Sequence, residues 1–161
     1  MSKRTLILSI VVVGIILDQG TKLLVHRTIP LYQSIPVIDG FFSLTHVRNR
    51  GAAFSILSQT PWRLPFFLAV TLVAMVTVGV MLRRVDSTRT LEITGLSLIL
   101  SGALGNLIDR LRLGEVIDFL DIFWRGHHWP AFNVADSAIC IGVGILIYDT
   151  LRRERAKKEG G

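Results

Sequence analysis

The chain has 161 residues, half of them hydrophobic, and a formal net charge of +6 at pH 7. The apolar residues gather in long blocks instead of recurring with the period of one amphipathic core, which indicates a membrane protein. The basic residues stand at the ends of these blocks and follow no single polar face, so the charge does not favour a nucleic-acid-binding protein. The single cysteine, Cys140, lies within an apolar block, so it forms no intramolecular disulfide and is interpreted as a packing residue.

The apolar blocks are long enough for spanning helices, which need roughly 20 mostly apolar residues each. We expect an all-α polytopic membrane protein, residues 1–161 forming a single membrane domain with four spans. The spans are placed at about 5–25, 64–82, 91–108 and 132–149. Lys3 and Arg4 precede the first block as in a secretory signal. However, Asp18 and Lys22 follow it in place of a small-residue cleavage site, which predicts a retained span.

Two longer connections, residues 26–63 and 109–131, join spans on one side of the membrane. An Asp39–Gly40 turn followed by the alternating run FFSLTHVRN predicts a small hairpin at the membrane surface. Trp124 and Trp129 in the second connection are typical of the headgroup level. The basic tail, residues 150–161, is expected to be disordered. Short basic segments decide orientation, so both termini are predicted to be cytoplasmic.

Polar residues near a bilayer are costly and need a reason. Asp18 and Lys22 lie four apart on one helix face, which fits a structural ion pair as well as a site. Asn49 and Gly51 could form a turn that leads into a surface segment. Asn106, Asp109 and Arg110 share a helix face beside the small residues Gly102 and Gly105, which fits a buried hydrogen-bond network or a site equally.

Two further aspartates stand close to the same side of the membrane. Asp118 lies within the apolar run EVIDFLDIF, where desolvation disfavours its charged form. Taken alone, this residue is more simply interpreted as an ordinary carboxylate in a loop. Asp136 lies three residues after Asn133 at the start of the fourth span. Two carboxyls held close together share a proton and can activate water for hydrolysis without a covalent intermediate. The adjacent His127 and His128 have no spaced third ligand, so no metal site is expected.

Five motifs, DQGTK, NRGAAFSIL, SGALGNLIDR, VIDF and FNVAD, occur in this order between Asp18 and Asp136. Together they make the chain resemble the bacterial lipoprotein signal peptidases, the type II signal peptidase family, over nearly its full length. The resemblance implies four spanning helices with a small extracytoplasmic β-cradle and a short membrane-surface helix. It also implies an aspartyl endopeptidase of the bacterial inner membrane that needs no cofactor.

The resemblance further implies the substrate and the site. Prolipoproteins are cut just before their diacylglyceryl-modified cysteine, at the outer, periplasmic face, by an enzyme expected to be a monomer. Membrane lipid and peptide antibiotics such as globomycin are the other expected partners, and nucleic acid is not. Carried over by motif, Asp118 and Asp136 are catalytic. The substrate-binding or site-supporting residues are Asp18, Lys22, Asn49, Gly51, Gly102, Asn106, Asp109, Arg110, Asn133 and Ala135.

Two other classes of protein remain as alternatives. A small transporter or proton-conducting subunit would also carry intramembrane acids and bases, although the second span offers no polar path. A non-catalytic assembly partner would use the glycine-rich faces to bind other spans.

Overall fold

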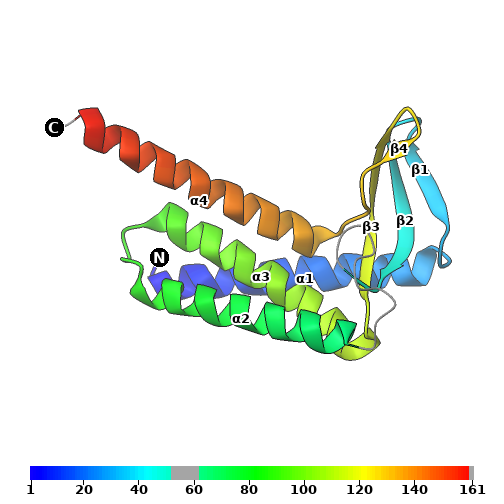
Figure 1. Ribbon diagram of the computed structural model, residues 1–161, viewed down its shortest axis with the longest axis horizontal. Helices are drawn as coiled ribbons and strands as arrows, with labels where there is room; N and C mark the ends of the chain where they lie inside the picture. Colours follow the sequence, from blue (N-terminus) through cyan, green and yellow to red (C-terminus); the bar gives the residue numbers. More distant parts are fainter. Residues whose placement is uncertain (52–61, 160–161) are drawn as a thin grey trace.

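The computed structural model describes residues 1–51 and 62–159 (Figure 1). Its helices and strands follow the chain as α1 (Lys3–Thr28), β1 (Ser34–Ile38), β2 (Phe42–Asn49), α2 (Arg63–Arg84), α3 (Thr90–Leu113), β3 (Val116–Trp124), β4 (His127–His128) and α4 (Val134–Glu159).

Four helices in the described part of the chain are long and apolar enough to cross a membrane, as the sequence predicts. α3 lies at the centre and packs against α1, α2 and α4, whereas α1 and α2 make almost no contact with each other. Both chain termini lie at one end of the bundle, and the strands stand at the other (Figure 1). α1, α2 and α3 extend beyond both ends of their predicted spans, whereas α4 begins two residues later than predicted and extends beyond its span at the C-terminal end. A helix can continue into the polar layer on either side of the apolar core.

The strands form one antiparallel sheet in the order β1-β2-β3-β4. β1 and β2 make the hairpin that the Asp39–Gly40 turn predicts, and Gly40 takes a positive φ of 74° there. β2 pairs with β3 so that Val47 faces Asp118 and Asn49 faces Val116. This register brings the second and fourth sequence motifs together. The expected membrane-surface helix would fall on residues 52–61, which lie outside the described part of the chain.

Two apolar clusters hold the elements in place. One joins the end of α1 to the sheet through Val25, Ile29, Ile117 and Phe119. The other joins α2 to α3 near the termini and consists of Val78, Leu82, Val85, Ile93 and Leu96. Most other large apolar side chains on α1 and α2 are exposed, which is the arrangement expected where lipid surrounds the bundle.

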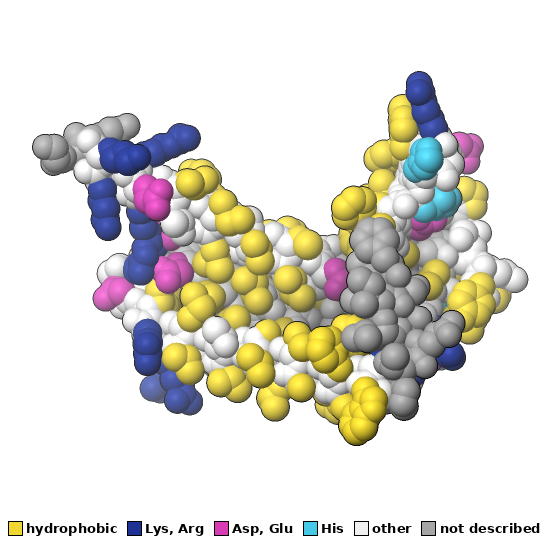
Figure 2. Space-filling view, in the orientation of Figure 1, with side chains coloured by type: hydrophobic (Ala, Val, Ile, Leu, Met, Phe, Trp, Pro, Cys, Tyr) yellow, Lys and Arg dark blue, Asp and Glu magenta, His cyan; other side chains and the backbone are white. Residues whose placement is uncertain are grey.

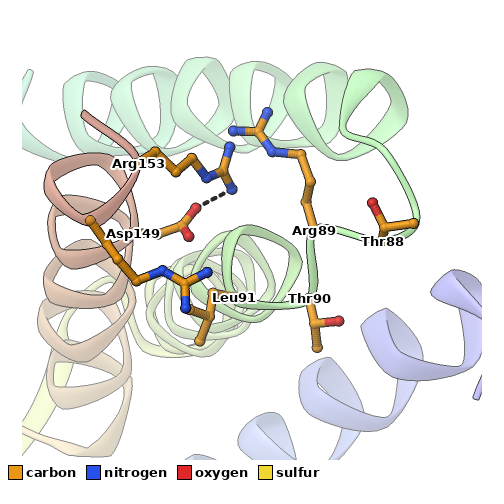
Figure 3. Close-up of a pocket in the computed structure, with 7 residues that line it drawn as sticks. Thr88, Arg89, Thr90, Leu91, Asp149 and Arg153 are labelled. Carbon is orange, nitrogen blue, oxygen red and sulfur yellow. Dashed lines mark hydrogen bonds and ion pairs between the residues drawn. The ribbon is translucent and has the colours of Figure 1, made fainter. Parts of the chain in front are cut away.

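The expectation of a disordered tail is wrong, because α4 remains helical to Glu159. Its sequence there, LRRERAKKE, consists almost entirely of strong helix formers. Arg153 also ties this part of α4 to the body of the protein. Its guanidinium contacts Asp149 on its own helix (Figure 3). It also lies 3.3 Å from Glu92 of α3.

Candidate active site

Asp118 is a buried carboxyl group on β3, with 2% of its surface exposed. Asn49 of β2 donates to its Oδ2 at 2.8 Å, and Asn133 donates to its Oδ1 at 2.7 Å. Burial and the negative charge of Asp136 raise the pKa of Asp118 from 3.8 to about 7, although the two amide hydrogen bonds lower it. Near neutral pH this group can therefore carry or release a proton.

Asp136 lies in the first turn of α4, where a reciprocal capping arrangement fixes it. The backbone N–H of Asp136 donates to Asn133 Oδ1 at 2.9 Å, and the N–H of Asn133 donates to Asp136 Oδ2 at 3.3 Å. Asn133 thus satisfies helix N–H groups that would otherwise lack partners. Asn106 of α3 donates to Asp136 Oδ1 at 2.7 Å. The sequence places Asn133 and Asp136 on one face, and the structure shows why: they cap the helix together.

Asn133 also links the two aspartates. While its carbonyl oxygen caps α4, its amide nitrogen donates to Asp118 and, at 3.2 Å, to Asn106 Oδ1. Asn133 is completely buried, so its orientation is fixed by these contacts. One asparagine therefore sets the position of both carboxyl groups, one on a strand and the other on a helix.

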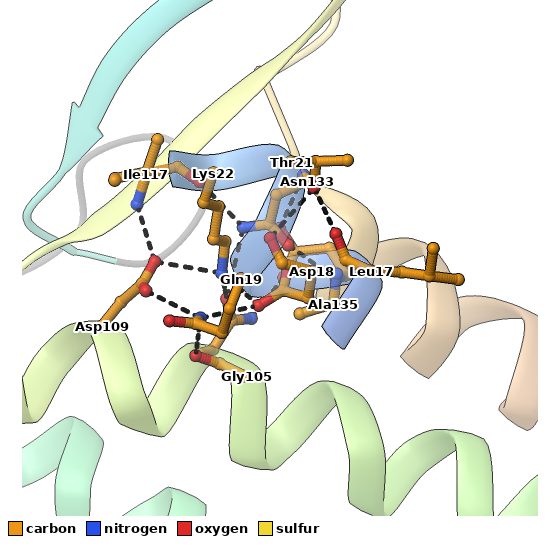
Figure 4. A network of polar contacts seen from close by, with 12 residues as sticks. Leu17, Asp18, Gln19, Thr21, Lys22, Gly105, Asp109, Ile117, Asn133 and Ala135 are labelled. Atoms are coloured by element: carbon orange, nitrogen blue, oxygen red, sulfur yellow. Dashed lines mark hydrogen bonds and ion pairs between the residues drawn. The ribbon is translucent and has the colours of Figure 1, made fainter. Parts of the chain in front are cut away.

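Beneath this pair, α1 and α3 form a buried ionic cluster (Figure 4). The ammonium of Lys22 lies 2.9 Å from Asp18 and 3.0 Å from Asp109, and it donates to Asn106 Oδ1 at 3.0 Å. All three of its protons thus have acceptors. Gln19 closes the cluster by donating to Asp18 and Asp109, each at 3.0 Å. The pairing of Asp18 with Lys22 that the helix spacing predicts is confirmed.

The two acids of this cluster also hold the backbone next to the two aspartates above. Asp18 Oδ1 accepts the N–H of Ala135 at 2.9 Å, one residue before Asp136. Asp109 Oδ2 accepts the N–H of Ile117 at 3.1 Å, one residue before Asp118. Hydrogen bonds to charged acceptors are short and strong. The cluster therefore supports the site by positioning both segments that carry its carboxyl groups.

Gly102 and Gly105 allow α1, α3 and α4 to meet at this point. A Cβ at Gly102 would lie 2.2 Å from the carbonyl oxygen of Ala135, and one at Gly105 would lie 2.4 Å from Asp18 Oδ2. Neither separation is compatible with ordinary atomic contact. Both positions thus need glycine, so that Asp18 can reach the first turn of α4.

A groove of about 570 Å³ opens beside Asp136, between α4 and the residues that precede it. Figure 2 shows the molecule hollowed between the sheet and the C-terminal part of α4. Asn49, Gly51 and Arg110 line the groove on one side, and Trp129, Pro130, Ala131, Phe132, Asp136, Ser137, Cys140 and Ile141 complete it. The guanidinium of Arg110 lies 5.2 Å from the ring of Phe67 on α2. Asp136 thus borders a largely apolar groove.

Comparison with known proteins decides the family. The model of the family described as signal peptidase (SPase) II matches residues 10–152. The chain belongs to the signal peptidase II family. It is 59% identical over 147 residues to a lipoprotein signal peptidase of Geobacter metallireducens, with 91% of each chain covered. A lipoprotein signal peptidase of Geobacter sulfurreducens is also 59% identical, over 92% of this chain and 93% of the relative.

Two solved structures resemble this chain over nearly its full length. One, described as a bacterial membrane enzyme structure at 2.3 Å resolution, superposes with a TM-score of 0.85 at 36% identity, covering 95% of this chain and 92% of the other. A second bacterial membrane enzyme has a TM-score of 0.81 at 32% identity, covering 90% and 92%. Membership of the signal peptidase II family makes this chain a membrane-bound protease and sets aside the transporter and assembly-partner alternatives.

The structure brings all of the expected site residues to one end of this signal peptidase II chain, and it adds others. Gln19 was not singled out from the sequence, although it adjoins Asp18 in the first motif and its amide bridges both acids of the cluster. The interpretation of Cys140 as a packing residue is wrong, because its side chain is exposed and lines the groove. His128 lies 2.9 Å from Asp121 and stacks on a neighbouring aromatic ring.

Proposed function

We propose that the chain is an aspartyl endopeptidase that removes signal peptides from prolipoproteins, cutting just before the diacylglyceryl-modified cysteine. Asp118 and Asp136 are the proposed catalytic pair. The observation that carries the proposal is that a strand and a helix each present a carboxyl group to the same asparagine, Asn133, at the edge of an apolar groove.

The raised pKa of Asp118 supports this chemistry. Two close carboxyls do not readily ionise together, so the pair holds one proton near neutral pH. The ionised carboxylate takes a proton from water, whose oxygen attacks the scissile carbonyl carbon. The protonated carboxyl stabilises the developing oxyanion, and a proton then passes to the leaving amine as the C–N bond breaks. No metal or cofactor enters these steps.

The groove suits a lipid-anchored substrate. Its apolar wall includes Trp129, Phe132 and Ile141, and it opens beside a helix that crosses the membrane. We infer that the diacylglyceryl group and the signal helix remain in the bilayer and hold the scissile bond at Asp136. Binding energy from these remote parts would position the reacting carbonyl. A peptide antibiotic such as globomycin would occupy the same groove.

The charge distribution supports an orientation. Lys and Arg side chains gather at the end that holds both termini (Figure 2). Basic segments remain cytoplasmic, so we infer that both termini face the cytoplasm of a bacterial inner membrane. The catalytic pair then lies at the periplasmic face, where water reaches it. The chain is proposed to act as a monomer.

The decisive experiment is cleavage of a purified, diacylglyceryl-modified prolipoprotein by the detergent-solubilised protein. We expect the parent to cut before the lipidated cysteine, and Asp118→Asn and Asp136→Asn each to lower the rate by at least about a hundredfold. Asp121→Asn is the matched control, because Asp121 lies on the same strand outside the site and should leave the rate unchanged. A folded parent that does not cut, or a dyad variant that cuts at the parental rate, would contradict the proposal.

A further inference from the structure

A second cleft lies at the opposite end of the bundle, between the first turns of α1 and the last turns of α2. Its volume is about 390 Å³, within the roughly 300–1,000 Å³ of ligand-binding clefts. It is lined by Lys3, Arg4, Ile7, Gly79, Leu82 and Arg83. The lining therefore combines three cations with an apolar floor, and it contains no acid.

The floor has room for an apolar chain. A Cβ at Gly79 would meet no atom within 4 Å, whereas Leu82 beside it is buried in the cluster that joins α2 to α3. α1 and α2 hardly touch each other along their length. An apolar molecule that lay in this cleft would therefore contact both helices at once without displacing a protein side chain.

The cations at the mouth of the cleft are only partly neutralised. Lys3 Nζ donates to the carbonyl oxygens of Arg83, at 3.4 Å, and Val85, at 2.5 Å, at the end of α2. One of its three protons remains available. Within residues 1–51 and 62–159, neither Arg4 nor Arg83 forms an ion pair with a carboxylate.

Among these three cations, Lys3 interacts with the negative charge of Asp86. Thr88 donates to its carboxylate through its hydroxyl at 2.6 Å and its backbone N–H at 2.8 Å. These bonds, and to a smaller extent the charge of Lys3, lower the pKa of Asp86, so it stays ionised. One anion against three cations leaves the mouth of the cleft positive.

The cleft between α3 and α4 at the same end of the bundle is a useful contrast (Figure 3). It measures about 430 Å³ and contains Arg89 and Arg153. Both arginines, however, are paired with acids: Arg89 lies 2.9 Å from Glu92, and Arg153 contacts Glu92 and Asp149. Arg152 is the third cation of this lining, which otherwise consists of Thr88, Thr90, Leu91 and Asp149. This cleft therefore contains an acid and lacks the apolar floor of Ile7, Gly79 and Leu82 that the α1–α2 cleft has.

We propose that the α1–α2 cleft binds one anionic phospholipid. The phosphodiester headgroup would lie against Lys3, Arg4 and Arg83, and an acyl chain would lie along Ile7, Gly79 and Leu82. Basic pockets between spans are suited to anionic lipid headgroups. The bound lipid fills the gap between two helices that α3 otherwise holds together, so it stabilises the bundle.

The test uses the delipidated full-length protein in detergent, titrated with phosphatidylglycerol or with phosphatidylcholine of identical acyl chains. Native mass spectrometry counts the bound lipids, and thermal unfolding measures their effect. We expect the first bound phosphatidylglycerol to be preferred over phosphatidylcholine by at least about tenfold and to raise Tm. Glycerophosphoglycerol, which has the headgroup without acyl chains, should not compete at equal concentration.

The variants separate this cleft from the general charge of the protein. Arg4→Gln/Arg83→Gln should weaken phosphatidylglycerol binding roughly 25-fold, at about fivefold for each cation near an anionic lipid. Arg155→Gln/Lys157→Gln removes the same charge from exposed positions on α4 and should leave the first binding event unchanged. Gly79→Leu keeps every cation but fills the apolar floor of the cleft. It should abolish the preference of the first binding event for phosphatidylglycerol over phosphatidylcholine.

Several results would overturn the proposal. These are equal binding of the two lipids by the parent, equal losses in both double variants, undiminished binding by Gly79→Leu, or effective competition by glycerophosphoglycerol. Because the cleft lies at the opposite end from Asp118 and Asp136, failure here would leave the proposed peptidase function intact. Cleavage of prolipoprotein, measured separately, tests that function.

Discussion

The raised pKa of Asp118 predicts how the free energy of unfolding of this protein depends on pH. Its carboxyl group has an ordinary pKa of 3.8 and a folded-state pKa of about 7. Between these values the folded protein binds one more proton than the unfolded chain, so the free energy of unfolding falls as pH rises. The stability contribution is fully present below about pH 4 and is lost as pH rises through 7.

The magnitude follows from the same values. Each pKa unit corresponds to about 1.4 kcal/mol, so the full rise amounts to about 4 kcal/mol of unfolding free energy. Asp118→Asn removes the titrating group. We therefore expect the stability of Asp118→Asn relative to the parent to increase by about 2 kcal/mol between pH 5 and pH 7, because the folded-state carboxyl group is still half protonated at pH 7.

The unfolding free energies can be measured by SDS titration in mixed micelles, followed by tryptophan fluorescence, at pH 5, 6, 7 and 8. Asp39→Asn, in the exposed hairpin turn, is the control and should follow the parent at every pH. A constant difference between Asp118→Asn and the parent across this range would refute the reasoning. Peptidase activity of the parent should also decline above about pH 7, because the pair then loses its shared proton.

Three further changes test the supporting structure. Lys22→Met leaves Asp18 and Asp109 buried without their cation, so unfolding free energy should fall by about 3–5 kcal/mol; a loss below about 1 kcal/mol in the same titration would contradict the cluster. Gly105→Ala drives a methyl group into Asp18 and should cost about 1–3 kcal/mol together with activity. Gly144→Ala, with open space around it, should be neutral within about 1 kcal/mol. Cys140→Trp should block the groove and raise KM for prolipoprotein severalfold, whereas Cys140→Ala should cleave normally; equal kinetics in both would exclude the groove as the substrate path.

The arrangement of the bundle explains why its two ends differ. The end with the sheet buries three aspartates, one lysine and two asparagines in one network: Asp18, Asp109, Asp118, Lys22, Asn106 and Asn133. Its hydrogen bonds join α1, α3, β3 and the start of α4. The end with the termini has exposed cations and an apolar cluster. Polar groups that are completely paired can be buried without a large loss of stability, which is what permits an ionic site so close to lipid.

The sequence by itself determined the four spans, because a length of apolar chain that crosses a bilayer is a local property. It also determined the β1–β2 hairpin through its turn, and the pairing of Asp18 with Lys22 through helix spacing. It did not determine that α4 stays helical to Glu159, because the high charge of the tail favours disorder whereas its helix propensity favours a helix.

Only the tertiary structure decided how the motifs meet. The register between β2 and β3 brings the side chain of Asn49 within hydrogen-bond distance of Asp118. Asn133 caps α4 at Asp136 and also donates to Asp118, so it links the two aspartates. Gln19 and the exposed face of Cys140 had no local signal, because their roles depend on what lies opposite them on other helices. Hydrogen bonds between distant segments and the clefts between helices arise from packing, and the order of residues along one segment does not encode either of them locally.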